Sequence, residues 1–375
     1  MRVLVLNPGS ANLKATVLDL PGTEPRSDST TPWTGTDPDA RRAVVTSAAD
    51  GIARTGIPLD TIDGVGYRVV HGGERFVAPA VADDEVVAAI AASGDLAPLH
   101  NPIAAETIRA GRAILPGAVH VAVFDTAFHA TLPETARRYP VPDEWVAAGV
   151  RRFGFHGLSV AWSVERAAVL LGRSPADLRL IVAHLGGGCS VTAVDGGRSV
   201  DTSMGMTPLE GLMMGTRAGS IDPGIVFRLL RDGRSAAAIE DDLDHRSGLL
   251  GVAGTADMAA LLERSAGGDR RATLAIDLFV RRAAAGIAGM ATSLPRVDAV
   301  VFTGGIGEHA PRIRQEVCDR LAVLGLAGQV TLADDDGSSQ DAILAHGPAT
   351  AVLRIRARED VVVARAVSEA SASAR

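Results

Sequence analysis

Short runs of apolar residues that end in glycine or a polar residue alternate with longer stretches in which apolar residues recur every three or four positions. The short runs predict β-strands, over residues 2–6, 15–20, 66–70, 119–124, 180–185, 190–194, 299–302 and 350–355. The longer stretches predict amphipathic helices, over residues 102–115, 159–171, 223–232, 256–264, 272–293, 312–323 and 361–372. We expect Asn101 to cap the first of these helices and Pro102 to lie in its first turn. This alternation is typical of an α/β protein with partly parallel sheets.

A strand–turn–strand pattern occurs twice in the chain. It reads LVLNPGSANLKATVLDL at residues 4–20 and LIVAHLGGGCSVTAVDGG at residues 180–197. The two copies lie about half a chain apart, which predicts a duplicated fold with a cleft between its halves. We expect one domain at residues 1–147, joined by a C-terminal helix at 361–375, and a second at residues 148–360. Residues 22–38 and 334–340 are polar and turn-rich, which predicts surface loops.

The composition is that of an ordinary globular protein. The 375 residues are 47% hydrophobic and 22% charged, and the formal net charge is −7. This balance gives no bulk positive field for nucleic acid or an anionic membrane. The four apolar residues before Asn7 are too few for a signal peptide, and no apolar run is long enough to span a membrane. The two cysteines cannot form a disulfide framework, so we expect a cytoplasmic protein.

Glycine-containing turns follow three of the expected strands. They read LNPGS at 6–10, HLGGGCS at 184–190 and TGGIGE at 303–308. Glycine lets backbone N–H groups approach an anion closely, although such turns also serve a purely structural purpose. None of the three fits the P-loop or the dinucleotide fingerprint. Three such turns in one α/β chain favour a nucleotide site.

Polar residues at the ends of strands or among glycines provide the candidate chemistry. They are Arg68, Asp125, His156 and Arg217. Ligands of open α/β sheets bind at the carboxyl ends of strands, and phosphoryl transfer needs cationic donors together with a carboxylate. Each residue also has an ordinary alternative: a solvated arginine, a hydrogen-bonded histidine or a turn-capping aspartate. The sequence lacks a His-x-x-x-His pair and a Gly-x-Ser-x-Gly motif, which argues against a zinc site and an α/β-hydrolase.

Motifs along nearly the whole chain resemble the acetate kinase family, within the actin, heat-shock chaperone and sugar-kinase superfamily. They are NPGS (7–10), RVVHGGE (68–74), APLHNP (97–102), VFDTAFHATLPE (123–134), RRFGFHG (151–157), AHLGGG (183–188), MTPLEGLMMGTR (206–217), DPG (222–224) and FTGGIGE (302–308). The resemblance implies two duplicated ribonuclease-H-like domains around an active-site cleft. It also implies reversible phosphoryl transfer from ATP to acetate or propionate.

The resemblance implies roles for individual residues. Arg68 and Arg217 would bind the substrate carboxylate and the transferring phosphoryl group, His156 would donate to that group, and His100 would assist positioning. Asp125 would orient the carboxylate or the metal. The acetate methyl would lie among Val70, Leu99, Phe155 and Pro208.

The resemblance also implies the cofactor, the nucleotide contacts and the partners. Asn7 and Glu359 would hold Mg²⁺ or Mn²⁺. The nucleotide would contact Lys14, His184, Gly186, Gly187, Gly188, Asp257, Gly304, Gly305, Ile306 and Gly307. Family members are commonly homodimers, so we expect the same here, with a small carboxylate and a nucleotide as ligands.

Departures from the family pattern gather on the nucleotide side. Asn12, Gly187, Ser220 and His309 stand where the family has Ser, Asn, Asp and Asn, and Ala259 stands where it has an adenosine-contacting arginine. Leu158 and Val160 replace a Thr and a His around Ser159, and RARED at 356–360 replaces a TNEE-like segment. Drift explains these changes if backbone N–H groups bind the phosphates. A different donor, such as pyrophosphate, and a catalytically silent relative are the alternatives.

Overall fold

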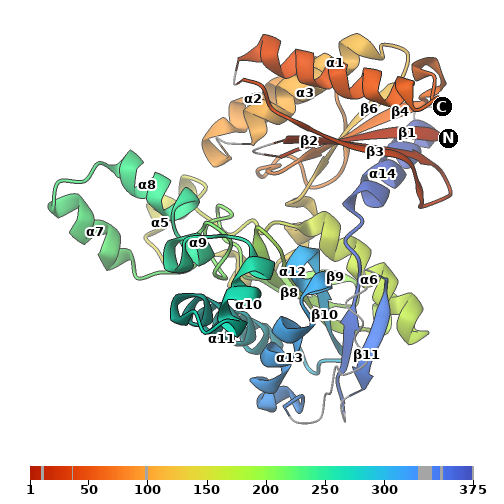
Figure 1. Ribbon diagram of the computed structural model, residues 1–375. Helices are drawn as coiled ribbons and strands as arrows, with labels where there is room; N and C mark the ends of the chain where they lie inside the picture. The colour runs from red at the N-terminus through yellow and green to blue at the C-terminus, as the bar shows by residue number, and fades with distance from the viewer. Residues whose placement is uncertain (10–11, 36, 98–99, 328–339, 347–348, 374–375) are drawn as a thin grey trace. The chain divides into compact units, whose positions relative to one another are not determined.

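The computed structural model describes residues 1–375 except 10–11, 36, 98–99, 328–339, 347–348 and 374–375 (Figure 1). The chain folds into two compact units. The first unit comprises Met1–Ala130 with Arg358–Arg375, and the second comprises Thr131–Ala357. The chain thus passes between the units at 130/131 and 357/358, where the sequence predicted boundaries at 147/148 and 360/361.

The first unit contains a six-stranded sheet in the order β3-β2-β1-β4-β6-β5. Helices α1 and α3 cover one face of this sheet and α14 covers the other (Figure 1). Its elements are β1 (Arg2–Pro8), β2 (Asn12–Asp19), β3 (Pro25–Pro32), α1 (Pro38–Arg54), β4 (Gly64–Val69), β5 (Ala80–Val81), α2 (Asp84–Ala92), α3 (Asn101–Ile114), β6 (Val119–Phe124) and α14 (Glu359–Ser373).

The second unit contains a six-stranded sheet in the order β11-β12-β10-β7-β8-β9. Helix α6 packs on β7 and β10, and α11 packs on β7 and β8 (Figure 1). Its elements are α4 (Glu134–Arg137), α5 (Asp143–Ala147), α6 (Gly157–Leu171), β7 (Arg179–Leu185), β8 (Cys189–Asp195), β9 (Arg198–Thr202), α7 (Pro223–Arg231), α8 (Ala236–His245), α9 (Gly248–Ala253), α10 (Met258–Ala266), α11 (Arg270–Ala291), β10 (Ala299–Thr303), α12 (Gly304–His309), α13 (Pro311–Asp319), β11 (Ala342–His346) and β12 (Ala351–Arg354).

Both sheets have the same topology. In the first, β1, β2 and β3 form an antiparallel meander, β4 and β6 run parallel to β1, and β5 pairs antiparallel with β6 at the edge. In the second, β7, β8, β9, β10, β12 and β11 repeat these pairings in the same order. This confirms the duplicated α/β fold that the repeated hairpin predicted.

Two glycines on β4 allow α14 to lie close to the first sheet. A Cβ placed on Gly66 would lie 2.4 Å from Val363 Cγ1, and one on Gly64 would lie 2.5 Å from Val367 Cγ1. Because side chains alternate along a strand, Arg68 lies on this same face of β4. The close approach therefore brings the first turn of α14, which carries Glu359, to Arg68.

Some expected elements are wrong. Residues 22–38 were expected to form a loop but contain β3, whose sequence PRSDSTTP has no apolar face. Asn101 is not a helix cap: His100 is the capping residue of α3, and the Asn101 side chain bonds the backbone of His71. The helix expected at 312–323 ends at Asp319. Of the loop expected at 334–340, residues 334–339 lie outside the described residues.

None of the helices in the described part of the chain combines the length and the apolar character that crossing a bilayer requires.

Gly66→Ala is expected to lower the free energy of unfolding by about 1–3 kcal/mol, because the new methyl group collides with the stiff, β-branched Val363 and Val367. Urea denaturation measures the change. Gly289→Ala is the control, since this glycine is exposed on α11 with nothing near its Cβ position, and it should stabilise by up to about 1 kcal/mol. An unchanged urea midpoint for Gly66→Ala contradicts the close packing of α14.

Candidate functional site

In the first unit, three predicted residues lie together where neighbouring parallel strands end. Asn7 lies near the end of β1, Arg68 near the end of β4, and Asp125 directly after β6. Arg68 donates from Nε to Asp125 Oδ1 at 2.9 Å and from Nη2 to Oδ2 at 2.5 Å. Its Nη1 donates to Asn7 Oδ1 at 3.2 Å, and its Nε lies 3.6 Å from Glu359 Oε2 on α14. The four residues form one cluster, which we call the Arg68 cluster.

Charge in the Arg68 cluster is held away from water. The side chain of Asp125 is 1% exposed and that of Arg68 is 17% exposed. Burial raises the pKa of the Asp125 carboxyl to about 6, although the Arg68 guanidinium lowers it, and the Glu359 carboxylate raises it further. Burial disfavours the charge on Arg68, yet the carboxylates of Asp125 and Glu359 together raise the pKa of Arg68 above its usual value.

The remaining predicted residues of the first unit are more dispersed. Val70 is buried immediately after β4, and His100 precedes α3. Leu99 lies outside the described residues. Lys14, predicted to contact nucleotide, lies on β2 with its Nζ 3.7 Å from Asp28 Oδ2 on β3. The structure thus gives Lys14 an acidic neighbour within its own sheet.

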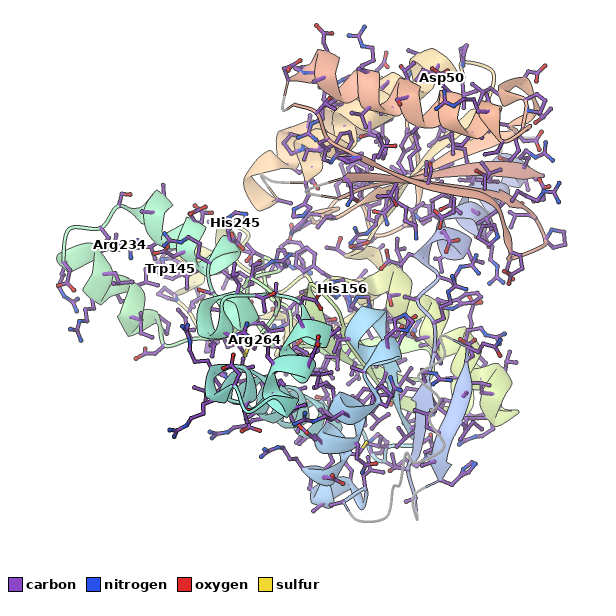
Figure 2. The ribbon with its side chains drawn as sticks, viewed as in Figure 1. Asp50, Trp145, His156, Arg234, His245 and Arg264 are labelled. Atoms are coloured by element: carbon purple, nitrogen blue, oxygen red, sulfur yellow. The ribbon has the colours of Figure 1, made fainter. Side chains whose placement is uncertain are left out.

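In the second unit, two predicted side chains converge on the glycine turn between β7 and β8 (residues 186–188). A Cβ placed on Gly188 would lie 3.2 Å from His156 Nε2 and 3.9 Å from Arg217 Nη1. His156 precedes α6 (labelled in Figure 2) with φ 58°, and among the described residues it is the only non-glycine with positive φ. This left-handed conformation costs on the order of 1–3 kcal/mol and directs the imidazole toward the turn.

The imidazoles of His156 and His184 are stacked. Their ring centroids lie 4.1 Å apart and the planes differ by 22°. Each Nδ1 atom contacts a serine hydroxyl, at 3.0 Å for His156 and Ser190 and at 2.8 Å for His184 and Ser159. A Cβ placed on Gly304 would lie 3.1 Å from His184 Nε2. Two cations at such a separation would repel each other by about 4 kcal/mol near a protein surface, so the stack disfavours a positive charge on both rings at once.

A loop at residues 203–220 carries Arg217 and Pro208 to the same region. Arg217 Nη1 donates to the Pro208 carbonyl at 2.9 Å, and Gly215 N donates to the Gly187 carbonyl at 3.1 Å. Phe155, the neighbour of His156, is buried. The structure therefore brings together the predicted residues Phe155, His156, His184, Gly186, Gly187, Gly188, Pro208, Arg217 and Gly304.

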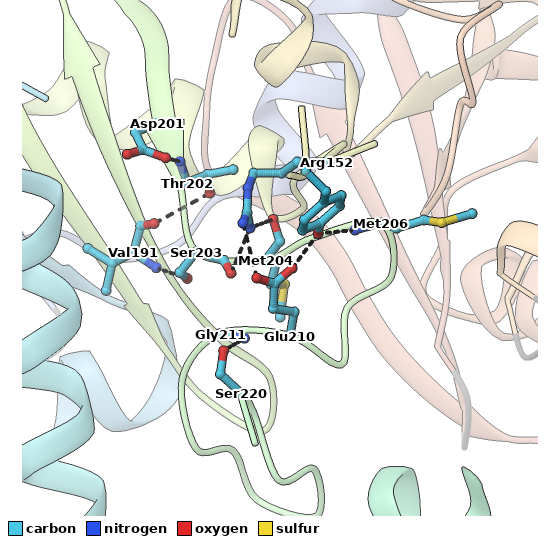
Figure 3. Close-up of polar contacts among 11 residues, drawn as sticks. Arg152, Val191, Asp201, Thr202, Ser203, Met204, Met206, Glu210, Gly211 and Ser220 are labelled. Carbon is cyan, nitrogen blue, oxygen red and sulfur yellow. Dashed lines mark hydrogen bonds and ion pairs between the residues drawn. The ribbon is translucent and has the colours of Figure 1, made fainter. Parts of the chain in front are cut away.

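Polar contacts fix this loop (Figure 3). Arg152 donates to the carbonyls of Ser203 and Met204 at 3.1 and 3.0 Å and to Glu210 Oε1 at 3.0 Å. Glu210 also accepts a hydrogen bond from the Tyr139 hydroxyl. Ser220, which departs from the family pattern, accepts a hydrogen bond from Gly211 N at 3.1 Å and so closes the base of the loop. Sequence reasoning missed this network because no motif spacing connects its members.

A pocket of about 290 Å³ opens beside the glycine turn in the second unit. Five predicted nucleotide residues line it, namely Gly186, Gly187, Asp257, Gly305 and Ile306. Ala259 and His309, two departures from the family pattern, line it as well. Asp257 Oδ1 accepts a hydrogen bond from Ala259 N at 2.9 Å and thereby caps α10. Gly307 does not line this pocket and lies in α12 against Phe302 of β10.

Comparisons with known proteins agree on one family. A model of the Acetokinase family matches residues 34–365. An acetate kinase of Trichormus variabilis is 41% identical over 97% of this chain and 98% of its own length. A crystal structure of Porphyromonas gingivalis acetate kinase has a TM-score of 0.87 at 31% identity, covering 98% of this chain and 99% of its own. A propionate kinase structure from Francisella tularensis has a TM-score of 0.86 at 35% identity, covering 97% and 98%.

Asp125 is expected to make stability fall as pH rises. Its folded pKa of about 6 lies above the ordinary value near 3.9, so the folded state keeps a proton that the unfolded state releases between these pH values. Relative to Asp125→Asn, the wild type should therefore lose on the order of 1–3 kcal/mol from pH 4 to 6, measured by urea denaturation.

Asp298→Asn is the control, because the pKa of Asp298 is shifted in the opposite direction from that of Asp125. Arg296, Arg179 and Arg173 lower the pKa of Asp298 in spite of its burial, so its contribution grows as pH rises. If wild type and Asp125→Asn show parallel pH profiles, the carboxyl of Asp125 does not titrate in a buried charged cluster.

Proposed function

Because the chain belongs to the acetokinase family, we propose that it transfers a phosphoryl group between ATP and acetate, with propionate as a second acceptor. The chain is a phosphotransferase with a carboxyl group as acceptor. The convergence of His156 Nε2 and Arg217 Nη1 on the glycine turn, beside a pocket of about 290 Å³, is the structural observation that carries the proposal.

The reaction needs placement and charge neutralisation rather than a strong base. A carboxylate oxygen attacks the γ-phosphorus of ATP, and the bond between that phosphorus and the β,γ-bridging oxygen breaks. The products are an acyl phosphate and ADP. Because a carboxylate is already an adequate nucleophile, alignment and donors to the phosphoryl oxygens supply most of the barrier reduction.

In the first unit, we assign acceptor binding to Arg68. Its guanidinium is oriented by Asp125 through two hydrogen bonds, which leaves the group fixed in direction while it retains its positive charge. Such a fixed cation can pair with the carboxylate of a small organic acid. Asp125 is thus proposed to act by orienting Arg68.

Asn7 and Glu359 provide the oxygen ligands that suit Mg²⁺ or Mn²⁺. The carboxamide oxygen and the carboxylate contact different nitrogens of Arg68. Among the described residues, no group of three or more His, Cys, Asp or Glu side chains is placed to hold a metal ion by itself, but magnesium usually takes one or two carboxylates together with phosphates and water. When bound, the ion neutralises phosphate charge.

In the second unit, we assign the phosphoryl oxygens to His156 and Arg217, and the nucleotide to the neighbouring pocket. Glycine and apolar side chains line most of that pocket. Backbone N–H groups can therefore bind phosphates, while the apolar surface accommodates a base. A reaction that consumes ATP is expected in the cytoplasm.

Pyrophosphate is the second candidate donor, because Ala259 presents no cation to the pocket. The apolar lining of the pocket favours a nucleotide, since pyrophosphate has no apolar part to bury.

Acetate, ATP and Mg²⁺ are expected to give an acyl phosphate that hydroxylamine traps as the hydroxamate, and pyrophosphate is expected to give none. Arg217→Ala and His156→Ala should each lower kcat by roughly 10²–10³-fold, as loss of a donor to a developing charge does. Arg281→Ala, at an exposed position on α11, is the matched control and should retain full activity. Near-full turnover in either site variant contradicts these roles.

We also propose that the protein is a homodimer that associates through α7. This helix has no buried residue, and Ile225, Phe227 and Leu230 are 46%, 58% and 41% exposed. Figure 1 shows α7 and α8 extending away from the sheet of the second unit. An apolar helix that its own chain leaves uncovered matches a self-complementary dimer face.

Phe227→Asp is expected to convert the dimer to a monomer, because a central aromatic anchor is worth about 2 kcal/mol or more at an interface. Sedimentation velocity at micromolar concentration measures the mass. Val169→Asp is the control, since Val169 is 65% exposed on α6, which lies on the opposite side of the second unit from α7 (Figure 1). A wild-type monomer, or a variant that remains dimeric, contradicts the proposed interface.

A further inference from the structure

Two serine hydroxyls contact the stacked histidines on the side away from the glycine turns. Ser190 lies on β8 and Ser159 on α6, and both side chains are fully buried. Their Oγ atoms lie 3.0 Å from His156 Nδ1 and 2.8 Å from His184 Nδ1. These contacts come from two different elements, so the two rings are held independently.

The hydrogen-bond inventory determines the direction of each bond. Within the described residues, the imidazole is the only hydrogen-bond partner found for either serine hydroxyl. A buried O–H group without an acceptor costs free energy, and Nδ1 is the acceptor within hydrogen-bond distance of each of these two hydroxyls. The hydroxyl therefore donates, Nδ1 accepts, and the single proton of the neutral ring resides on Nε2.

This tautomer points two N–H groups at the glycine turns. Nε2 of His156 lies 3.2 Å from the Cβ position of Gly188, and Nε2 of His184 lies 3.1 Å from that of Gly304. A neutral imidazole in this form donates a hydrogen bond without carrying a positive charge, which suits a stacked pair that disfavours two positive charges.

We infer that Ser190 and Ser159 are positioning residues that fix His156 and His184 as Nε2–H donors toward the phosphoryl group. The inference rests on the proposed function for its consequence in catalysis. The assignment of the tautomers is independent of the proposed function, because they exist in the protein without ligand.

Long-range ¹H–¹⁵N correlation spectra of histidine-labelled protein test the tautomers directly. They are recorded at a pH of about 8, where histidines of ordinary pKa are neutral. The wild type should show Nε2–H forms for His156 and His184, identified by the signals lost in His156→Gln and His184→Gln. An Nδ1–H form in the wild type overturns the inference, whether or not any serine variant folds.

Serine variants test the consequence. Ser190→Ala should make His156 a mixture of tautomers and lower kcat about 10- to 100-fold, the range typical when a bond that orients a functional histidine is lost. The KM for acetate should change little, and Ser190→Thr, which keeps the hydroxyl, should restore the tautomer. Ser159→Ala should do the same to His184.

The chain offers two matched controls. Ser163 lies one turn after Ser159 on α6, and its buried hydroxyl has no partner among the described residues. Thr192 lies two residues after Ser190 on β8 and bonds Thr202 instead. Ser163→Ala and Thr192→Val should leave the histidine signals and kcat unchanged.

The two kinds of failure are separable. Unchanged tautomers and kcat in both serine variants overturn the positioning role. If the tautomers shift as expected but the wild type forms no acyl phosphate, the proposed function fails while the serine–histidine assignment stands.

Discussion

The buried charge of Arg68 is the constraint on which the first unit depends. A largely buried guanidinium must be compensated by its neighbours, and its partners come from the ends of two other strands and from the C-terminal helix. Two of them, Asn7 and Glu359, lie near opposite ends of the chain. Gly64 and Gly66 of β4 matter for the same reason. Because they have no side chains, α14 packs close enough to the strand to bring Glu359 Oε2 within 3.6 Å of Arg68 Nε. A set of residues scattered in sequence thus becomes one electrostatic unit.

The second unit has the same topology but places a different set of groups at the end of its sheet. At this position the glycine turn presents backbone N–H and C=O groups rather than carboxylates. The side chains that approach the turn, His156 and Arg217, are hydrogen-bond donors. His156 reaches this position through a strained left-handed conformation, and Arg217 reaches it through a loop fixed by Arg152, Tyr139 and Glu210. An acceptor that carries negative charge and a donor rich in phosphate both need such groups, because each must be neutralised before the two can react.

The sequence predicted those features that follow from a repeating pattern or from position at a strand end. The duplicated hairpin gave the two sheets, and polar residues after apolar runs led to Arg68 and Asp125. β3 was not predicted, because this edge strand is polar on both faces and so shows no alternation of apolar and polar residues. Ser159 and Ser190 were missed as functional residues for another reason: a serine within a regular helix or strand reveals nothing about its partner until the elements are packed. Network residues such as Glu210 were missed likewise.

The departures on the nucleotide side follow from how this pocket is built. Where glycine backbone supplies the contacts, the identity of neighbouring side chains is weakly constrained, so Gly187 in place of an asparagine leaves a carbonyl that still receives Gly215 N. Ala259 and His309 lie on the wall of the pocket, where a change alters the lining and leaves the backbone of the glycine turn in place. The Arg68 cluster differs, because removing Asp125 or Glu359 leaves the largely buried charge of Arg68 less well compensated. A change in a side chain of the pocket should therefore cost less than a change in the Arg68 cluster, where buried charges must match.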